Sequence, residues 1–199
     1  EIERQYGEAI GEYNIDQGSL FGKNYEITFI SGKLEIKPLN ITGVIFENMS
    51  VVYDGEEHTI EVSGLTSAMS VSYINNSATN AGIYNAEAVI SKENHSTLRL
   101  YATLTIEGLD FEGLAMDNKT VIYNGEYQYL EIFNLFDGAE VNFNQQAKNV
   151  GEYNITAVIS KLNYKDLEIE ATLTIEPAEA YVYIENAVKE AGEADPEID

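Results

Sequence analysis

The sequence predicts a mainly β protein made of small modules in tandem, and three observations support this prediction. The stretch Asn80–Glu107 returns as Asn149–Glu176, with 17 of 28 positions identical. Apolar and polar residues alternate with a period of two through both stretches, as in strands that have one buried face. The connections between the expected strands are short and rich in Ser and Gly, which disfavours helices.

The repeat divides the chain into four pieces. Leu34, Leu104 and Leu173 occupy the same place in successive copies, 70 and 69 residues apart. The pieces are the C-terminal half of a repeat (residues 1–37), two complete repeats (38–107 and 108–177) and the start of a further repeat (178–199). A repeat of this size is at the small end for burying its own core, so we expect it to pack against neighbouring repeats of the same polypeptide.

The opening half-repeat predicts two strands. The stretch Tyr25–Phe29 alternates apolar with polar residues, and Leu34 and Ile36 alternate in the same way after Gly32. A period of two places the apolar side chains of such strands on one buried face.

The complete repeats begin with a strand that leads into a turn. Met49–Tyr53 predicts this strand in the first copy, and Asp54-Gly55 follows it directly. Asp-Gly between β-rich flanks predicts a hairpin with a type I′ turn, because both residues accept positive φ. Asn124-Gly125 occupies the same place in the second copy and carries the same prediction. Further strand pieces are expected at Ile60, Val62, Val71 and Tyr73.

Two long strands close each complete repeat, and their faces are expected to differ. The outward face of the last strand carries Arg99 and Tyr101 in one copy but Glu168 and Glu170 in the other, whereas the inward face stays apolar. Side chains on a buried face stay apolar from one copy to the next, whereas side chains on a solvent-exposed face are free to change. The inward residues are Tyr84, Ala86, Ala88, Ile90, Leu98, Leu100, Ala102, Leu104 and Ile106 in the first copy, and Leu167, Ile169, Ala171, Leu173 and Ile175 in the last strand of the second.

The last piece, residues 178–199, begins another copy. Tyr181–Asn186 predicts a strand, and residues 191–196 occupy the place of the turn. Because this piece is the start of a repeat and the opening piece, residues 1–37, is the finish of one, the last piece of one chain could pair as an added strand with the opening piece of another chain.

Composition disfavours several classes of function. The 34 acidic and 11 basic residues give a net charge of −23, which disfavours nucleic acid and anionic membrane surfaces as partners. We interpret the charge as a solubilising, self-repelling surface, with Ca²⁺ sites or a cationic partner as alternatives. The chain has no cysteine, and no apolar run approaches the roughly 18 residues that cross a bilayer. No cofactor is expected, and no membrane insertion of this segment.

Several motifs recur in the same order in both complete repeats: a Tyr-X-Gly turn, an Asn-X-Gly-X-Tyr segment, an asparagine before the last strand and a closing Leu-Thr-Ile. They resemble the MBG-type repeats of bacterial cell-surface adhesins, and the resemblance covers nearly the whole chain. It implies small β-grasp-like modules with mixed and antiparallel sheets, little helix and an elongated array. The last copy departs from the pattern, with Ala191 in place of the turn tyrosine. The repeat signature is Tyr53, Gly55, Gly82, Tyr84, Asn94, Tyr123, Gly125, Gly151, Tyr153 and Asn163.

The signature residues are expected to serve the fold. Tyr13, Tyr84 and Tyr153 follow the same glycine in three copies, which suggests a corner that fixes the loop to the sheet. An asparagine recurs in the loop before the last strand and is expected to form a turn there, because asparagine tolerates left-handed backbone geometry. These loop residues are Asn24, Asn94 and Asn163.

No residue pattern points to catalysis. His58 and His95, the two histidines, are replaced by Gln128 and Tyr164 in the next copy, so no histidine recurs as a ligand or base. The carboxylates are spread over wet faces and turns rather than paired as in a glycosidase. Tyrosine stacks on sugars as well as filling cores, and three tyrosines at variable outward positions are the candidates for ligand binding. They are Tyr101, Tyr127 and Tyr129.

The sequence therefore predicts a non-enzymatic, extracellular repeat module that serves as a stalk or scaffold of a bacterial surface protein. We expect it at the cell surface or in the cell wall, with the signal and the anchor outside this stretch. The alternative is a module that binds a host glycan or a host surface protein on an exposed face bearing tyrosines.

Overall fold

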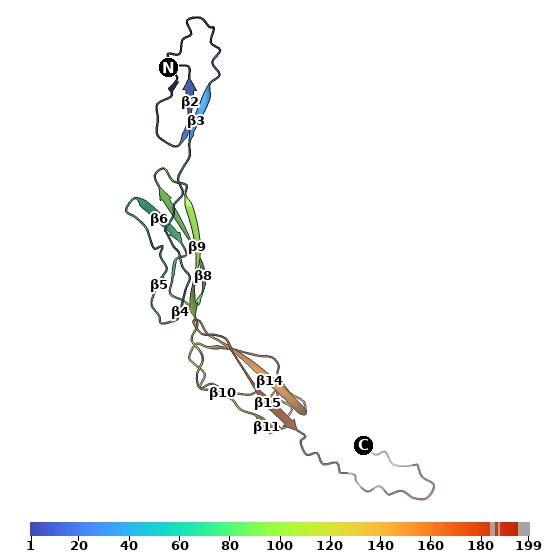
Figure 1. Ribbon diagram of the computed structural model, residues 1–199. Coiled ribbons are helices and arrows are strands. Elements are labelled where there is room, and N and C mark those ends of the chain that lie inside the picture. The colour runs from blue at the N-terminus through green and yellow to red at the C-terminus, as the bar shows by residue number, and fades with distance from the viewer. Residues whose placement is uncertain (184–185, 187, 195–199) are drawn as a thin grey trace. The chain divides into compact units, whose positions relative to one another are not determined.

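The computed structural model describes residues 1–183, 186 and 188–194 (Figure 1). Every regular element among these residues is a β-strand and none is a helix, so the described chain is all-β with several sheets. The described residues therefore contain no helix that is long and apolar enough to span a membrane. The described residues form two compact units, one of Glu1–Asp110 with Leu162–Lys165 and one of Phe111–Lys161 with the described residues from Asp166 onward.

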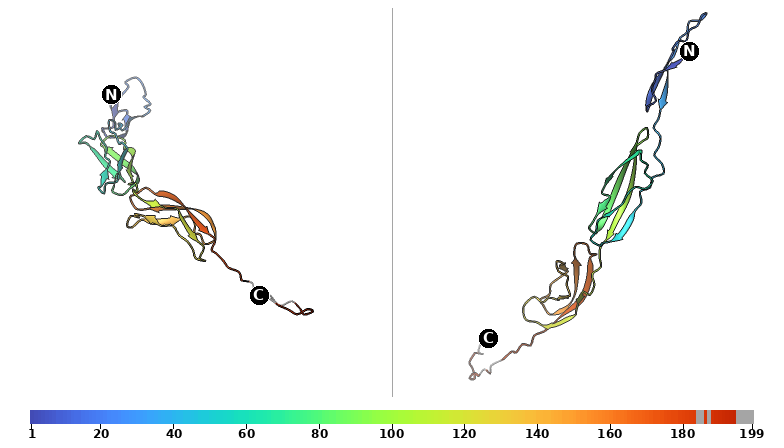
Figure 2. Two further views of the ribbon diagram at one scale, coloured as in Figure 1. Left: turned by 90° about the horizontal axis from the view of Figure 1, so that it is seen from below. Right: turned by 90° about the vertical axis from the view of Figure 1, so that its left-hand side faces the viewer.

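The main sheet of the first unit has four strands in the order β4-β9-β8-β6. The long strands β8 (Gly82–Lys92) and β9 (Leu98–Glu107) form an antiparallel hairpin, drawn in green in Figures 1 and 2. β6 (Met69–Ile74) adds antiparallel to β8, and β4 (Met49–Val52) adds parallel to β9. The sheet is therefore mixed. A short antiparallel pair, β5 (His58–Thr59) with β7 (Ser77–Ala78), completes this part of the unit.

The opening piece forms a separate small sheet in the order β1-β2-β3, with β1 at Glu3–Arg4, β2 at Gly11–Asp16 and β3 at Gly32–Ile36. The predicted strand at Tyr25–Phe29 is wrong, because these residues belong to no strand. In the complete repeat the corresponding residues are His95–Arg99, of which Leu98 and Arg99 pair with the end of the long strand β8. In the opening piece β2 ends at Asp16, and the chain then turns through Gly18, whose φ is +54°. The alternating pattern therefore lacks a partner strand here.

The second unit repeats the plan, with a main sheet in the order β11-β15-β14-β13. β14 (Gly151–Ser160) and β15 (Leu167–Glu176) form the antiparallel hairpin, β13 (Glu140–Phe143) pairs antiparallel with β14, and β11 (Lys119–Ile122) pairs parallel with β15. β10 (Ala115–Met116) pairs antiparallel with β12 (Ile132–Phe133). The equivalent contact in the first unit is an isolated bridge between Ile45 and Ser63.

The predicted inward faces are confirmed. Ala86, Ala88 and Ile90 are buried on β8, and the last five alternate positions of β9 and β15 are buried or half-buried in both units. Leu104 and Leu173, at equivalent positions, are 0% exposed and lie at the centre of their cores. The outward residues Arg99, Tyr101, Glu168 and Glu170 are exposed.

The predicted type I′ hairpins at Asp54-Gly55 and Asn124-Gly125 are wrong. Only the glycine of each pair has positive φ, +87° and +80°, and the strand before the turn pairs parallel with the last strand of its repeat. The turn therefore leads the chain away from β4, and the next strand, β5, pairs with β7 and not with β4. Local turn chemistry was visible in the sequence, but the parallel partner about 55 residues later was not.

The last piece contains no strand among its described residues, so the strand predicted at Tyr181–Asn186 is wrong for Tyr181–Tyr183 and Asn186, and its remaining residues, 184 and 185, lie outside the described residues. A strand needs a partner, and the described structure pairs none with this stretch. The predicted turn near Ala191 is present, with a hydrogen bond from Glu193 N to Glu190 O and φ of +97° at Gly192. Residues 195 and 196 of that prediction lie outside the described residues.

Candidate functional site

Tyr84 and Tyr153 fix the start of the long hairpin in each unit. Tyr84 donates its hydroxyl hydrogen to the backbone oxygen of Asn80 at 2.9 Å, and Tyr153 donates to that of Asn149 at 3.0 Å. Tyr13 makes the same bond, at 2.7 Å, to the carbonyl four residues before it. The predicted corner is therefore confirmed in three copies, and these tyrosines act in the fold.

Gly82 and Gly151 leave room for the tyrosine ring of this corner. A Cβ atom at Gly151 would lie 3.3 Å from ring atoms of Tyr153, and a Cβ atom at Gly82 would lie 3.3 Å from ring atoms of Tyr84. Because these distances are tighter than an ordinary van der Waals contact, a side chain at either glycine would displace the ring. The corner thus explains the glycine two residues before Tyr84 and Tyr153, whereas a Cβ atom at Gly11, two residues before Tyr13, would meet nothing within 4 Å.

Asn94 and Asn163 adopt the left-handed geometry that the sequence predicts, with φ of 58° and 67°. Their backbone oxygens accept hydrogen bonds from Leu39 N–H at 3.0 Å and from Leu109 N–H at 2.9 Å. These bonds tie the first residues of each repeat to the loop before its last strand. The prediction is wrong for Asn24, which has no positive φ, because the loop that carries it does not join two long strands.

Tyr53 and Tyr123 extend the parallel strand pairs by one hydrogen bond. Their N–H groups donate to the backbone oxygens of Glu107 and Glu176, each at 2.8 Å. The positive φ of the glycine two residues later, Gly55 or Gly125, then turns the chain. The Tyr-X-Gly motif therefore ends a strand.

The middle residue of each motif makes its own set of hydrogen bonds. Asp54 Oδ1 accepts from Glu56 N–H at 2.9 Å and lies 3.0 Å from His58 Nε2. The backbone bond first, and the imidazole bond second, hold the pKa of Asp54 below its ordinary value of 3.8. In the second unit Asn124 Oδ1 accepts from Gln128 Nε2 at 2.8 Å, so a neutral amide pair replaces the aspartate and histidine. His58 therefore stabilises the Tyr-X-Gly turn through its contact with Asp54.

The three candidate tyrosines lie in different surroundings. Tyr101, 70% exposed on β9, borders an open concavity of about 510 Å³ beside Asn85. Tyr127 is 53% exposed and has Lys148 Nζ 5.6 Å from its ring centroid. Tyr129, also 53% exposed, lines a more enclosed pocket of the second unit. That pocket is the best-formed candidate for a binding site.

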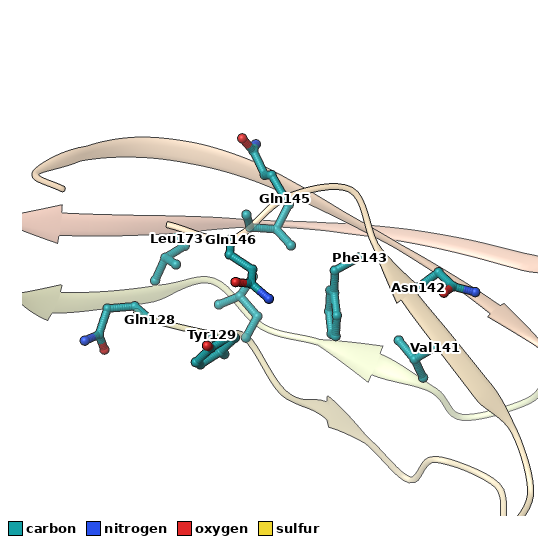
Figure 3. A pocket seen from close by; sticks show the side chains of 10 residues that line it. Gln128, Tyr129, Val141, Asn142, Phe143, Gln145, Gln146 and Leu173 are labelled. Carbon is teal, nitrogen blue, oxygen red and sulfur yellow. The ribbon is translucent and has the colours of Figure 1, made fainter. Parts of the chain in front are cut away.

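The pocket has a volume of about 270 Å³ and lies between β13 and the segment that contains Tyr129 (Figure 3). Buried or strand-borne apolar side chains form much of its wall. Gln146 reaches towards Tyr129 with Phe143 beside them, whereas Gln145 points the other way and donates its amide to Asn154 O at 2.8 Å. The lining residues are Gln128, Tyr129, Leu130, Val141, Asn142, Phe143, Gln145, Gln146, Ile155 and Leu173.

The sequence prediction missed two groups of residues. Asn48 Oδ1 accepts from Thr103 N–H at 2.8 Å, and Asn118 Oδ1 accepts from Thr172 N–H at 2.7 Å, so each asparagine begins the parallel strand pair. Their recurrence 70 residues apart was the available signal. The pocket residues around Gln146 were missed because a comparison of copies emphasises what recurs, whereas these residues differ.

The two histidines and the acidic side chains can be located in the described part of the chain. No group of three or more His, Asp or Glu side chains there could hold a metal ion. His95, the second histidine, contacts the backbone oxygen of Glu93 through Nδ1 at 2.7 Å. Each histidine is thus engaged locally.

No family model matches the chain, and no curated protein does either. Among solved structures, the crystal structure of the human desmocollin-1 ectodomain is similar to it with a TM-score of 0.25 and 11% sequence identity. The similarity covers 92% of this chain, which spans 50% of that chain. A likeness at this level carries no argument about fold or function.

Proposed function

We propose that the chain is a non-enzymatic, extracellular module of a bacterial surface protein, made of tandem β-grasp-like repeats of the MBG type in an elongated array, and that it serves as a stalk or scaffold. The residues that recur between copies act in turns, corners and cores, as the hydrogen bonds of Tyr84 and Tyr153 illustrate. What differs between copies is the outward face, where Tyr101 of one copy corresponds to Glu170 of the next. A stalk requires this combination of a repeated interior and an unconstrained surface.

One observation carries the proposal: in each repeat the strand before the Tyr-X-Gly turn pairs parallel with the last strand. β4 pairs with β9 from Met49 opposite Leu104 to Val52 opposite Glu107. β11 pairs with β15 from Lys119 opposite Leu173 to Ile122 opposite Glu176. Tension applied to the two ends of such a repeat pulls the paired strands along their length in opposite directions, so the hydrogen bonds between them are loaded together rather than one after another.

Further hydrogen bonds hold this strand, β4 or β11, at both ends. In the first unit, Asn48 binds Thr103 N–H before the strand begins, and Tyr53 N–H binds Glu107 O after it ends. In the second unit Asn118 and Tyr123 make the same two contacts. The same resistance to tension is therefore built into both repeats.

The proposal is tested by stretching single molecules of the whole chain from its two ends. The expected record contains two cooperative unfolding events, each releasing up to about 250 Å, since a repeat of ~70 residues extends by at most roughly 3.6 Å per residue. Smooth extension at low force, without discrete events, would contradict a role in bearing tension.

The alternative function, ligand binding, is favoured by one observation, the pocket of the second unit.

A further inference from the structure

The pocket of the second unit lies at a place that the first unit fills. There, the ring of Tyr73 packs against Phe46 with centroids 5.9 Å apart. The Tyr73 hydroxyl also accepts a hydrogen bond from Val62 N–H at 2.9 Å, which ties β6 to the opposite segment. Tyr73 is half-buried, and its contacts with Phe46 and Val62 fill the space between β6 and the segment that contains Val62.

Two substitutions remove this closure in the second unit. Phe143 stands in the place of Tyr73, and Met116 stands in the place of Phe46. Phenylalanine has no hydroxyl, so the hydrogen bond that Tyr73 accepts from Val62 N–H in the first unit has no counterpart at Phe143. The ring of Phe143 is 41% exposed and borders the pocket.

A shortened connection opens the same place further. The first unit has 10 residues between Val71 and its corner glycine, Gly82, whereas Val141 and Gly151 of the second unit enclose 9. In the first unit, Ile60 N–H donates to Asn76 O at 2.9 Å, and Asn76 Nδ2 donates to Ile60 O at 3.0 Å.

Within the described residues of the second unit, no such pair of hydrogen bonds joins Leu130 to the Gln145-Gln146 segment, and the strand contact is reduced to a bridge between Gln128 and Ala147. The space between Leu130 and Gln146 is the pocket. The opening thus follows from specific changes in a repeat whose remaining framework is the same.

The chemistry of the lining restricts the ligand. None of the lining residues is charged, although the chain carries a net charge of −23, so an ionic ligand has no partner here. Leu130, Ile155 and Leu173 supply buried apolar surface. The Gln146 amide makes no hydrogen bond to any described residue, and it can both donate and accept, as can the hydroxyl of Tyr129.

We propose that this pocket binds one neutral saccharide ring, such as the terminal sugar of a glycan. A sugar ring presents an apolar face of C–H groups that fits against Phe143 or Tyr129, and hydroxyl groups that match the Gln146 amide and the Tyr129 hydroxyl. A volume of about 270 Å³ is near the lower end of ligand pockets and suits a single ring better than an extended peptide. The site does not depend on the stalk function, which stands or fails by the stretching experiment.

The test is an NMR titration of the ¹⁵N-labelled full chain with neutral sugars, namely glucose, galactose, mannose, N-acetylglucosamine and N-acetylgalactosamine. We expect at least one of them to give saturable shifts at the side-chain amide of Gln146 and at the backbone of Tyr129. Gln146→Ala is expected to weaken that binding at least tenfold. Phe143→Tyr, which restores the residue of the first unit, is expected to weaken it as well by narrowing the pocket.

Tyr127→Ala is the matched control, because Tyr127 is as exposed as Tyr129 but does not line the pocket. It is expected to bind the sugar like the unaltered chain, and the backbone spectrum of each variant verifies its fold. The proposal is overturned if no neutral sugar gives saturable shifts, if a folded Gln146→Ala variant binds as well as the unaltered chain, or if Tyr127→Ala abolishes binding. Saturable binding of a peptide in this pocket, with no binding of sugars, would also overturn it.

Discussion

Replacing Asn118 by alanine removes the side chain that begins the parallel strand pair of the second unit. Asn118 Oδ1 accepts a hydrogen bond from Thr172 N–H at 2.7 Å, one residue before β11 takes over the pairing with β15. In Asn118→Ala the Thr172 N–H loses its acceptor, while its neighbours keep theirs. Because Thr172 is half-buried and residue 118 is exposed, water replaces the acceptor in part.

The expected cost is about 1 kcal/mol of the free energy of unfolding, the typical net value of one hydrogen bond. For a repeat of about 70 residues this lowers the melting temperature of the second unit by roughly 4–8 °C. Calorimetry of the whole chain measures that shift, and hydrogen exchange at the Thr172 amide, followed by NMR, measures the loss of protection at the site itself.

Two variants separate the hydrogen bond from a general effect of substitution. Asn118→Asp keeps an oxygen acceptor and is expected to retain protection of the Thr172 amide. Asp117→Ala changes the neighbouring exposed residue, which makes no hydrogen bond to any described side chain or backbone group, and is expected to leave both measurements unchanged. The reasoning is refuted if Asn118→Ala leaves Thr172 exchange unchanged, or if Asp117→Ala accelerates it equally.

Three further predictions follow from single contacts. Tyr153→Phe removes the hydroxyl of the corner and is expected to cost about 1 kcal/mol of unfolding free energy; an unchanged melting temperature would contradict the corner. Gly64→Ala, at φ +79° with its Cβ 2.1 Å from Gly43 O, is expected to cost more than about 2 kcal/mol, whereas Gly55→Ala, at φ +87° in open space, is expected to cost about 1 kcal/mol. Equal losses in denaturant titrations would refute the steric argument. The pKa of Asp54 is lowered in the folded state, so its stabilisation is present above the ordinary value of 3.8 and is lost as the pH falls through the lower folded value. Asp54→Asn, the residue of the next copy, is expected to flatten the acid part of the stability profile, and melting curves between about pH 5 and pH 2 test this.

The long hairpins were predictable from the sequence because their information is local. Strict alternation over ten residues fixes which face of β9 and β15 is buried, and comparison of Arg99 with Glu168 identifies the wet face. The corner tyrosines were predictable for a similar reason, since glycine, tyrosine and the accepting carbonyl all lie within five residues. Short-range patterns of this kind recur in both copies and can be recognised by comparing them.

The parallel strand and the pocket were not predictable in the same way. β4 finds its partner 55 residues later, and nothing in Met49–Val52 distinguishes a parallel partner from an antiparallel one. Phe143, which borders the pocket, lacks the hydroxyl of Tyr73, and the connection between Val141 and Gly151 is one residue shorter than its counterpart in the first unit. Only the folded first unit shows that the Tyr73 hydroxyl binds Val62 N–H. A strand pattern also fails where a partner is missing, as at Tyr25–Phe29.

The direction in which the parallel strands are loaded provides the most direct test of the stalk proposal. The chain has no cysteine, so pairs of cysteines introduced at exposed residues of the second unit serve as unique attachment points. Handles at Glu112→Cys and Glu179→Cys pull β11 and β15 along their length, whereas handles at Glu126→Cys and Glu179→Cys peel the pair from one end. The account predicts an unfolding force several times higher for the first pair of handles at the same pulling speed. Equal forces in the two geometries would contradict it.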